Sequence, residues 1–289
     1  MTDFRWRMLL LWTITIVFAI FTILTSLKPE LISPGMLGIV NTVLLVAFAL
    51  VHGITDYGAR AMAVFVVVCL VVSNFFENLS IVTGFPFGHY HYTEALGPKF
   101  FLVPVTIGGA YFGAGYLSWS VARVLLGRLT PGIDNVARWA LPLVAGFLMA
   151  SWDFMLDPSA STIDHDWIWE HGGGFFGVPF ENYLGWLLTV VIFFAIFAAY
   201  LAARPVAGDA ADARPPFGYW LQAIAMYALL GMRHLLTYLR PSKDASVVDA
   251  AGHVWLRHDI YETAALAAIF TVFAFSIFAV MRLIDSRAR

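Results

Sequence analysis

The chain has 289 residues, of which 60% are hydrophobic and only 12% are charged, about half the charged share of an ordinary soluble domain. A water-soluble fold is excluded, because a domain of this size could not bury so much apolar surface. The 17 basic and 19 acidic residues include no dense basic run, so the sequence gives no sign of nucleic-acid binding.

Apolar runs long enough to cross a bilayer recur along the whole chain, since a helix needs roughly 20 apolar residues to span a ~30 Å hydrocarbon core. The first run is interpreted as a span because no signal-peptide cleavage site follows it. The expected spans are residues 8–26, 36–54, 61–82, 101–126, 137–156, 183–203, 218–239 and 260–283. We predict an all-α fold, a polytopic transmembrane helical bundle of about eight spans, in one integral membrane domain over residues 1–289.

The connections indicate the orientation of these spans. Residues 83–100 and 157–182 form long loops rich in glycine, proline, histidine and aromatic residues, and residues 204–217 form a solvated loop. The two termini and the even-numbered loops carry more lysine and arginine than the opposite side. Because positive side chains favour the cytoplasmic side, both termini are predicted to be cytoplasmic, with the protein in the cell (inner or plasma) membrane.

With this orientation, the ionisable residues gather near the outer ends of the spans. Glu77 ends the third span there, Asp153 and Asp157 end the fifth, Asn182 opens the sixth, and Arg233 lies in the outer third of the seventh. A charged group at membrane depth costs roughly 2.5–3.5 kcal/mol, and such groups commonly face a cavity, a partner or a substrate path. The outer leaflet is therefore the expected side of the functional site.

Asp153 and Asp157 are spaced i, i+4, which places both carboxylates on one helix face, and Pro158 is expected to stop the helix directly afterwards. Acids in a last turn face the negative end of the helix dipole, at a cost of about 0.3–1 kcal/mol. One interpretation is structural: the pair caps neighbouring helices or binds Arg233. The other is that two carboxylates in a low-dielectric pocket divide into a protonated acid and an ionised base.

Two other features are open to a functional interpretation. His89, His91, His165 and His171 in the outer loops are candidate metal ligands, or interfacial side chains among aromatic residues. The HxxxH and HxxHH patterns of membrane di-iron oxygenases do not occur, so we predict no metal and no cofactor. The glycines of the fourth span are expected to allow close helix packing: Gly108, Gly109, Gly113 and Gly115.

Three blocks in order carry a family resemblance: TGFPFGHYHYTEALGPKFFLVPV, WDFMLDPSA and WIWEHGGGFFGVPFENYLGWLLT. Within about residues 70–200 the chain resembles the CruF-type carotenoid hydratase family, whose members are also described as carotenoid biosynthesis proteins. The resemblance implies addition of water across the terminal C=C bond of an acyclic carotenoid end, giving a tertiary alcohol. Its implied partners are a linear carotenoid, water and the lipid bilayer, with other carotenoid biosynthesis enzymes as candidates.

Hydration of such an alkene needs an acid, a sheltered tertiary cation and a water molecule with a base behind it. We expect Asp153, Asp157 and Glu77 to be catalytic, without assigning which carboxylate is the acid. The expected substrate-binding residues are Asn74, His89, Tyr90, Tyr92, Trp152, Asn182 and Arg233. The alternatives are a membrane oxygenase with a histidine-bound metal, and a non-enzymatic carotenoid- or lipid-binding protein or transporter.

Overall fold

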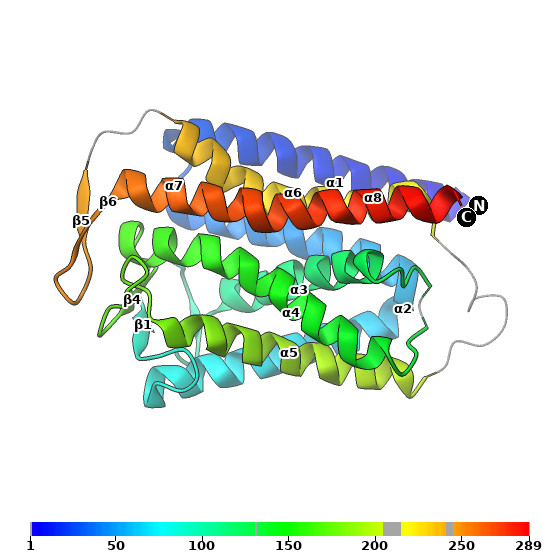
Figure 1. Cartoon of the computed structure of the whole chain (residues 1–289), viewed down its shortest axis with the longest axis horizontal. Helices are drawn as coiled ribbons and strands as arrows, with labels where there is room; N and C mark the ends of the chain where they lie inside the picture. Colours follow the sequence, from blue (N-terminus) through cyan, green and yellow to red (C-terminus); the bar gives the residue numbers. More distant parts are fainter. Residues whose placement is uncertain (1, 131, 205–214, 241–244, 289) are drawn as a thin grey trace.

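The computed structural model describes residues 2–130, 132–204, 215–240 and 245–288, and within them the protein is a bundle of long helices (Figure 1). Most of the expected solvated loop, residues 205–214, lies outside the described residues. The long helices are α1 (Thr2–Leu27), α2 (Pro34–Thr83), α3 (Val105–Leu125), α4 (Ala137–Asp157), α5 (Phe180–Ala202), α6 (Phe217–Leu239), α7 (Arg257–Ala268) and α8 (Ala274–Ala288). The prediction of an all-α fold is confirmed.

Two expected spans are joined in one element, because α2 has 50 residues and is interrupted at Gly58. Gly58 has φ 79° and ψ 162°, a conformation that only glycine adopts without strain. The two arms of α2, residues 34–57 and 59–83, run in opposite directions in Figure 1. The sequence placed two separate spans here without predicting this sharp kink.

Helical segments lie at all the positions where spans were expected, since α7, a π-helical stretch (Ile269–Phe273) and α8 follow one another as a continuous helix. Among the described residues, five helices are long and apolar enough to cross a membrane: residues 4–27, 34–83, 137–163, 180–202 and 257–287. α3 and α6 are outside this set. The count of about eight spans therefore stays a prediction, as does the cytoplasmic location of the termini.

α3 occupies the centre of the bundle, and every residue from Tyr111 to Val124 is buried. Its surroundings are other helices, which explains why it can carry serines and glycines in place of a continuous apolar run. A side chain at Gly109 or Gly113 would collide with Thr42 or Leu45 on α2. The prediction that the glycines of this span allow close packing is confirmed.

Short antiparallel strand pairs cover one end of the bundle. The pairs are β1 (Tyr90–Tyr92) with β4 (Trp167–Trp169), β2 (Lys99–Phe100) with β3 (Val103–Pro104), and β5 (Ser246–Val248) with β6 (Val254–Leu256). Figure 1 shows β1, β4, β5 and β6 at one end and both termini at the other. We call the first of these the strand end. The two loops that the sequence marked as unusual meet there.

Candidate active site

The pairing of β1 with β4 brings four aromatic side chains onto one face. Tyr90 lies opposite Trp169, and Tyr92 lies opposite Trp167. Because side chains alternate along a strand, all four share a face, and the intervening His91 lies on the other. Tyr90 and Trp169 are buried, and His91 is exposed. The two loops therefore fold together and present hydroxyl and indole donors to the helix ends beneath.

Glu77, a buried residue in the last turns of α2, accepts three tyrosine hydrogen bonds. Tyr90 and Tyr92 of β1 donate to Oε2, the latter at 2.9 Å, and Tyr111 of α3 donates to Oε1 at 2.8 Å. Hydrogen bonds to a carboxylate favour its ionised form. The arrangement gives a buried acceptor that three hydroxyl groups hold in place.

Asp153 and Asp157 are both buried and are linked through one amide. The Nδ2 group of Asn182, at the start of α5, donates to Asp153 Oδ2 at 3.1 Å and to Asp157 Oδ2 at 2.6 Å. Asp157 Oδ1 also accepts from the indole nitrogens of Trp167 and Trp169, at 2.9 and 3.2 Å. The two carboxylates therefore differ: among the described residues, Asp157 has three side-chain donors, whereas Asp153 has one.

The chain after Asp157 departs from the expectation that Pro158 stops the helix. The α-helix does end at Asp157, but a π-helical turn continues it over Pro158–Ile163. Proline is compatible with a first turn because its missing N–H would have no partner there. The Ser161 hydroxyl donates to the Asp157 carbonyl at 2.8 Å, which ties this turn to α4. π-Helical turns inside α-helices are frequent at functional sites.

A cavity of about 360 Å³ connects these groups. Glu77, Asp153, Asp157 and Asn182 line it. Its aromatic wall consists of Tyr90, Tyr92, Tyr111, Trp152, Trp167, Trp169 and Trp186. The Trp186 ring stacks on Tyr111 with the centroids 4.5 Å apart and an interplanar angle of 3°. The cavity thus joins carboxylates to π faces, which attract positive charge.

The remaining predicted site residues are placed differently. Trp152 lines the cavity, in edge contact with Trp186 at 6.1 Å between centroids. Asn74 lies outside the lining and accepts a 3.1 Å hydrogen bond from Asn78. His89 is exposed and outside the lining, with its ring 5.7 Å from that of His171.

Arg233 lines the cavity on the side of Asp164 and Asp166. Within the described chain it makes no ion pair with Asp153 or Asp157, so the structure does not support a salt bridge as the reason for these acids. Burial, together with the neighbouring Asp164 carboxylate, raises the pKa of Asp166 to about 7. Arg233 and the two loop acids therefore give this side of the cavity a charged lining.

The outer-loop histidines do not gather at one point. His91 faces Glu170 at 3.4 Å, and the His165 ring lies 3.2 Å from the Ser161 carbonyl oxygen. In the described part of the chain, one group of possible ligand atoms lies within 4.8 Å of one another: His258, Asp259 and Glu262, at the start of α7. Exposed groups of this kind are common without a metal, and the cavity lies elsewhere.

The sequence analysis did not assign Tyr111, Trp167, Trp169 and Trp186 to the site. The sequence does contain a pattern that could have predicted the two loop tryptophans. In both YHY and WIW, aromatic residues occupy every second position, which is typical of a strand with its aromatic side chains on one face. Tyr111 and Trp186 are single aromatic residues in apolar helices, and no local pattern distinguishes them.

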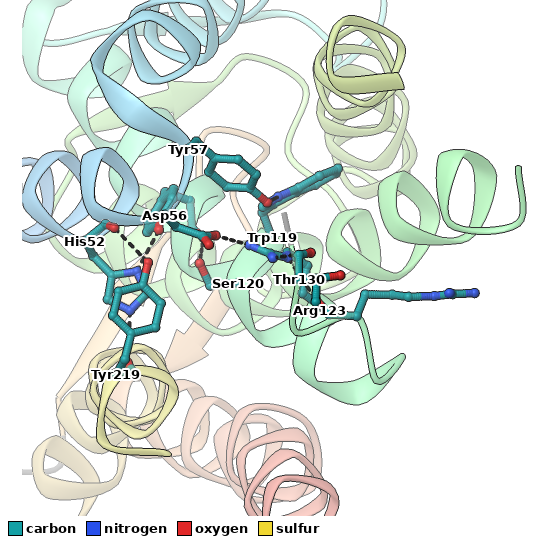
Figure 2. Close-up of polar contacts among 10 residues, drawn as sticks. His52, Asp56, Tyr57, Trp119, Ser120, Arg123, Thr130 and Tyr219 are labelled. Atoms are coloured by element: carbon teal, nitrogen blue, oxygen red, sulfur yellow. Dashed lines mark hydrogen bonds and ion pairs between the residues drawn. The ribbon is translucent and has the colours of Figure 1, made fainter. Parts of the chain in front are cut away.

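A second buried polar cluster joins α2, α3 and α6 away from this cavity (Figure 2). His52 contacts the Tyr116 hydroxyl at 2.6 Å and the Tyr219 carbonyl at 2.9 Å. Arg123 pairs with Asp56 and donates to the carbonyls of Arg128 and Thr130. Each of these polar groups is matched by another protein group, so we interpret the cluster as a structural tie between helices.

Comparison with known proteins agrees with the resemblance noted in the sequence. The family described as carotenoid biosynthesis protein matches residues 34–240. Over 141 residues the chain is 31% identical to the bisanhydrobacterioruberin hydratase of Haloarcula japonica, which covers 48% of this chain and 46% of that protein. The chain thus aligns with about half the length of this curated relative. No solved structure matches. The chain belongs to the carotenoid biosynthesis protein family.

Proposed function

We propose that this protein adds water across the terminal C=C bond of an acyclic carotenoid end and forms a tertiary alcohol. The observation that supports this most is the pair Asp153 and Asp157, buried in one cavity, bridged by Asn182 and unequal in their donors. Acid-catalysed hydration needs two proton transfers, and two carboxylates in different surroundings can perform both.

In this mechanism Asp153 is the acid. Its anion has a single donor, so burial favours its protonated form. Asp153 gives its proton to the less substituted alkene carbon, and the positive charge forms on the tertiary carbon. Water attacks that carbon and loses a proton to Asp157, whose three donors favour the ionised state. The proton then returns from Asp157 to Asp153 through water in the cavity, which restores both groups, while the Asn182 amide holds the two carboxylates side by side.

The remaining cavity groups shelter the cation. The faces of Trp186, Tyr111 and Trp152 offer π density, and cation–π attraction reaches about 2 kcal/mol or more where water is excluded. Glu77, held by its tyrosines, adds carboxyl oxygens with partial negative charge to the same cavity wall. Placement near one face of the membrane suits the substrate, because a linear carotenoid is about as long as the ~30 Å hydrocarbon core.

The test is conversion of lycopene by the purified protein in lipid nanodiscs, with Asp153→Asn and Asp157→Asn compared with wild type. Loss of a general acid or base lowers the rate by about 10²–10⁴. Full activity in both variants would refute the carboxylate mechanism. We further propose the cell membrane as the location, with both termini cytoplasmic, and other carotenoid biosynthesis enzymes as partners.

A further inference from the structure

The cavity is too small to hold a whole carotenoid. At about 360 Å³ it is near the lower end of the range that encloses a drug-sized molecule. An extended carotenoid reaches about the ~30 Å of the hydrocarbon core. Only the reacting end can therefore lie inside, and the polyene must leave the cavity through an opening in its wall.

One side of the cavity is unsuited to a polyene, because four ionisable groups line it: Asp164, Asp166, Arg233 and Arg240. Asp164 is also exposed, so this side borders the surface at the strand end. Placing an apolar chain there would desolvate charged groups without giving them partners. This side can admit water, but the chain needs another path.

The opposite side lies between the first arm of α2 and the beginning of α3. The two helices touch at Thr42 and Gly109, where a β-carbon on the glycine would collide with the threonine. One turn nearer the strand end, a β-carbon at Gly38 would meet no atom within 4 Å, although Gly38 lies on the cavity wall. Open space that belongs to the cavity therefore lies beside Gly38, one turn from the contact between the helices.

Small side chains and glycines line much of this space, which we call the α2–α3 slot: Gly35, Gly38, Thr42, Thr106 and Ala110. The adjacent Ile39 lines the cavity and is also 44% exposed, so the slot borders the outer surface of the bundle. Val105 beside it is 61% exposed. In a membrane protein such exposed apolar side chains face lipid. The slot thus connects the cavity that holds the carboxylates to the lipid phase.

We infer that the α2–α3 slot holds the polyene chain of the substrate beside its reacting end, and that Gly38 sets the width of the slot. The occupant is an unbranched, flat, apolar chain, since the slot lacks charged side chains and is bordered by lipid-facing groups. The identity of that chain rests on the proposed function. Occupation of the slot itself can be measured without any turnover.

The first test labels the slot chemically. Cys69 is the one cysteine of the chain and is fully buried, so Gly38→Cys introduces an accessible thiol against a low background. Val43→Cys, on the same helix and 58% exposed, is the matched control outside the slot. Both variants in nanodiscs are treated with N-ethylmaleimide, with and without lycopene.

Lycopene is expected to slow the labelling of Gly38→Cys about tenfold and to leave that of Val43→Cys unchanged. Equal labelling of Gly38→Cys with and without lycopene overturns the inference. Protection of Gly38→Cys without any gain of water in lycopene would support the slot and refute the proposed function, so the two failures are distinguishable.

The second test fills the slot. Gly38 has helical geometry, and a β-carbon there would meet no atom within 4 Å, so Gly38→Leu places its side chain in this open space. Its kcat/KM for lycopene should fall about tenfold or more, mainly through KM, as expected for a blocked binding groove. Val43→Leu should match wild type. Equal kinetics in Gly38→Leu and Val43→Leu overturn the assignment of Gly38.

Discussion

Replacing Asn182 by leucine tests the link between the two aspartates. Leucine has the same number of side-chain heavy atoms and the same branch point but no donor, so both hydrogen bonds of Nδ2, at 2.6 and 3.1 Å, are lost. Asp157 keeps its two indole donors, whereas Asp153 keeps no side-chain donor within the described residues. A hydrogen bond to a charged group contributes about 1.5–3 kcal/mol and one to a neutral group about 0.5–1.5 kcal/mol, so the bonds to ionised Asp157 and protonated Asp153 together amount to about 3 kcal/mol.

We expect this loss to appear in stability and in rate. A change of about 3 kcal/mol lowers the thermal midpoint of a chain of this size by roughly 6–12 °C. Turnover of lycopene should fall about 10²-fold, because the amide that holds the acid and the base side by side is removed.

The matched control for Asn182→Leu is Thr189→Val on the same helix. Thr189 is buried, and its hydroxyl makes no hydrogen bond with any residue that the structure describes. Its removal should be neutral or slightly stabilising. Equal midpoints and equal rates for Asn182→Leu and Thr189→Val would refute the bridged pair.

Three further predictions follow from the surrounding contacts. Glu77→Gln should lower lycopene turnover at least about tenfold. Tyr111→Phe removes only one of the three hydroxyl donors to Glu77 and should lower turnover less. Steady-state rates in the reverse order would contradict the role given to Glu77. Arg123→Met leaves the Asp56 carboxylate buried without its cation, which costs about 3–5 kcal/mol of folding stability. The thermal midpoint should therefore fall, while kcat per folded molecule stays the same. Loss of kcat at an unchanged midpoint would contradict a structural role for Arg123. Burial raises the pKa of Asp166 from 3.8 to about 7. Between these two pH values the folded protein holds a proton that the unfolded chain has released, so the stability of the fold decreases as the pH rises from 3.8 to about 7. Asp166→Asn should therefore have a higher midpoint than wild type at about pH 8 and an equal one at about pH 4; parallel curves would contradict the shift.

The sequence predicted the helices well because apolar runs of sufficient length have few alternatives in a membrane. It predicted two spans joined by a connection at residues 55–60, but it did not predict that helical backbone continues through this connection and is interrupted at Gly58 alone. The three carboxylates were identified because ionisable residues are rare at membrane depth. Tyr90, Tyr92 and Asn182 were also expected at the site, but their contacts with the carboxylates could not be predicted, because the two loops that pair through Tyr90 and Trp169 lie far apart in the chain.

Asn74 shows the limit of reasoning from depth alone. It is on the same helix as Glu77 and within one turn of it, but its side chain faces Asn78. The depth of a residue in the membrane gives its position along the helix axis, but it does not tell which neighbouring element the side chain contacts. The sequence therefore located the end of the bundle that holds the site, and packing decided which polar residues line the cavity.

The central claim is that the new hydroxyl oxygen comes from water. The most direct measurement is incubation of the purified protein with lycopene in H₂¹⁸O under ordinary oxygen, followed by mass spectrometry of the product. Hydration predicts a gain of one water whose oxygen is ¹⁸O, and the same yield without O₂. An unlabelled oxygen, or a product that forms only when O₂ is present, would contradict the account and favour an oxygenase.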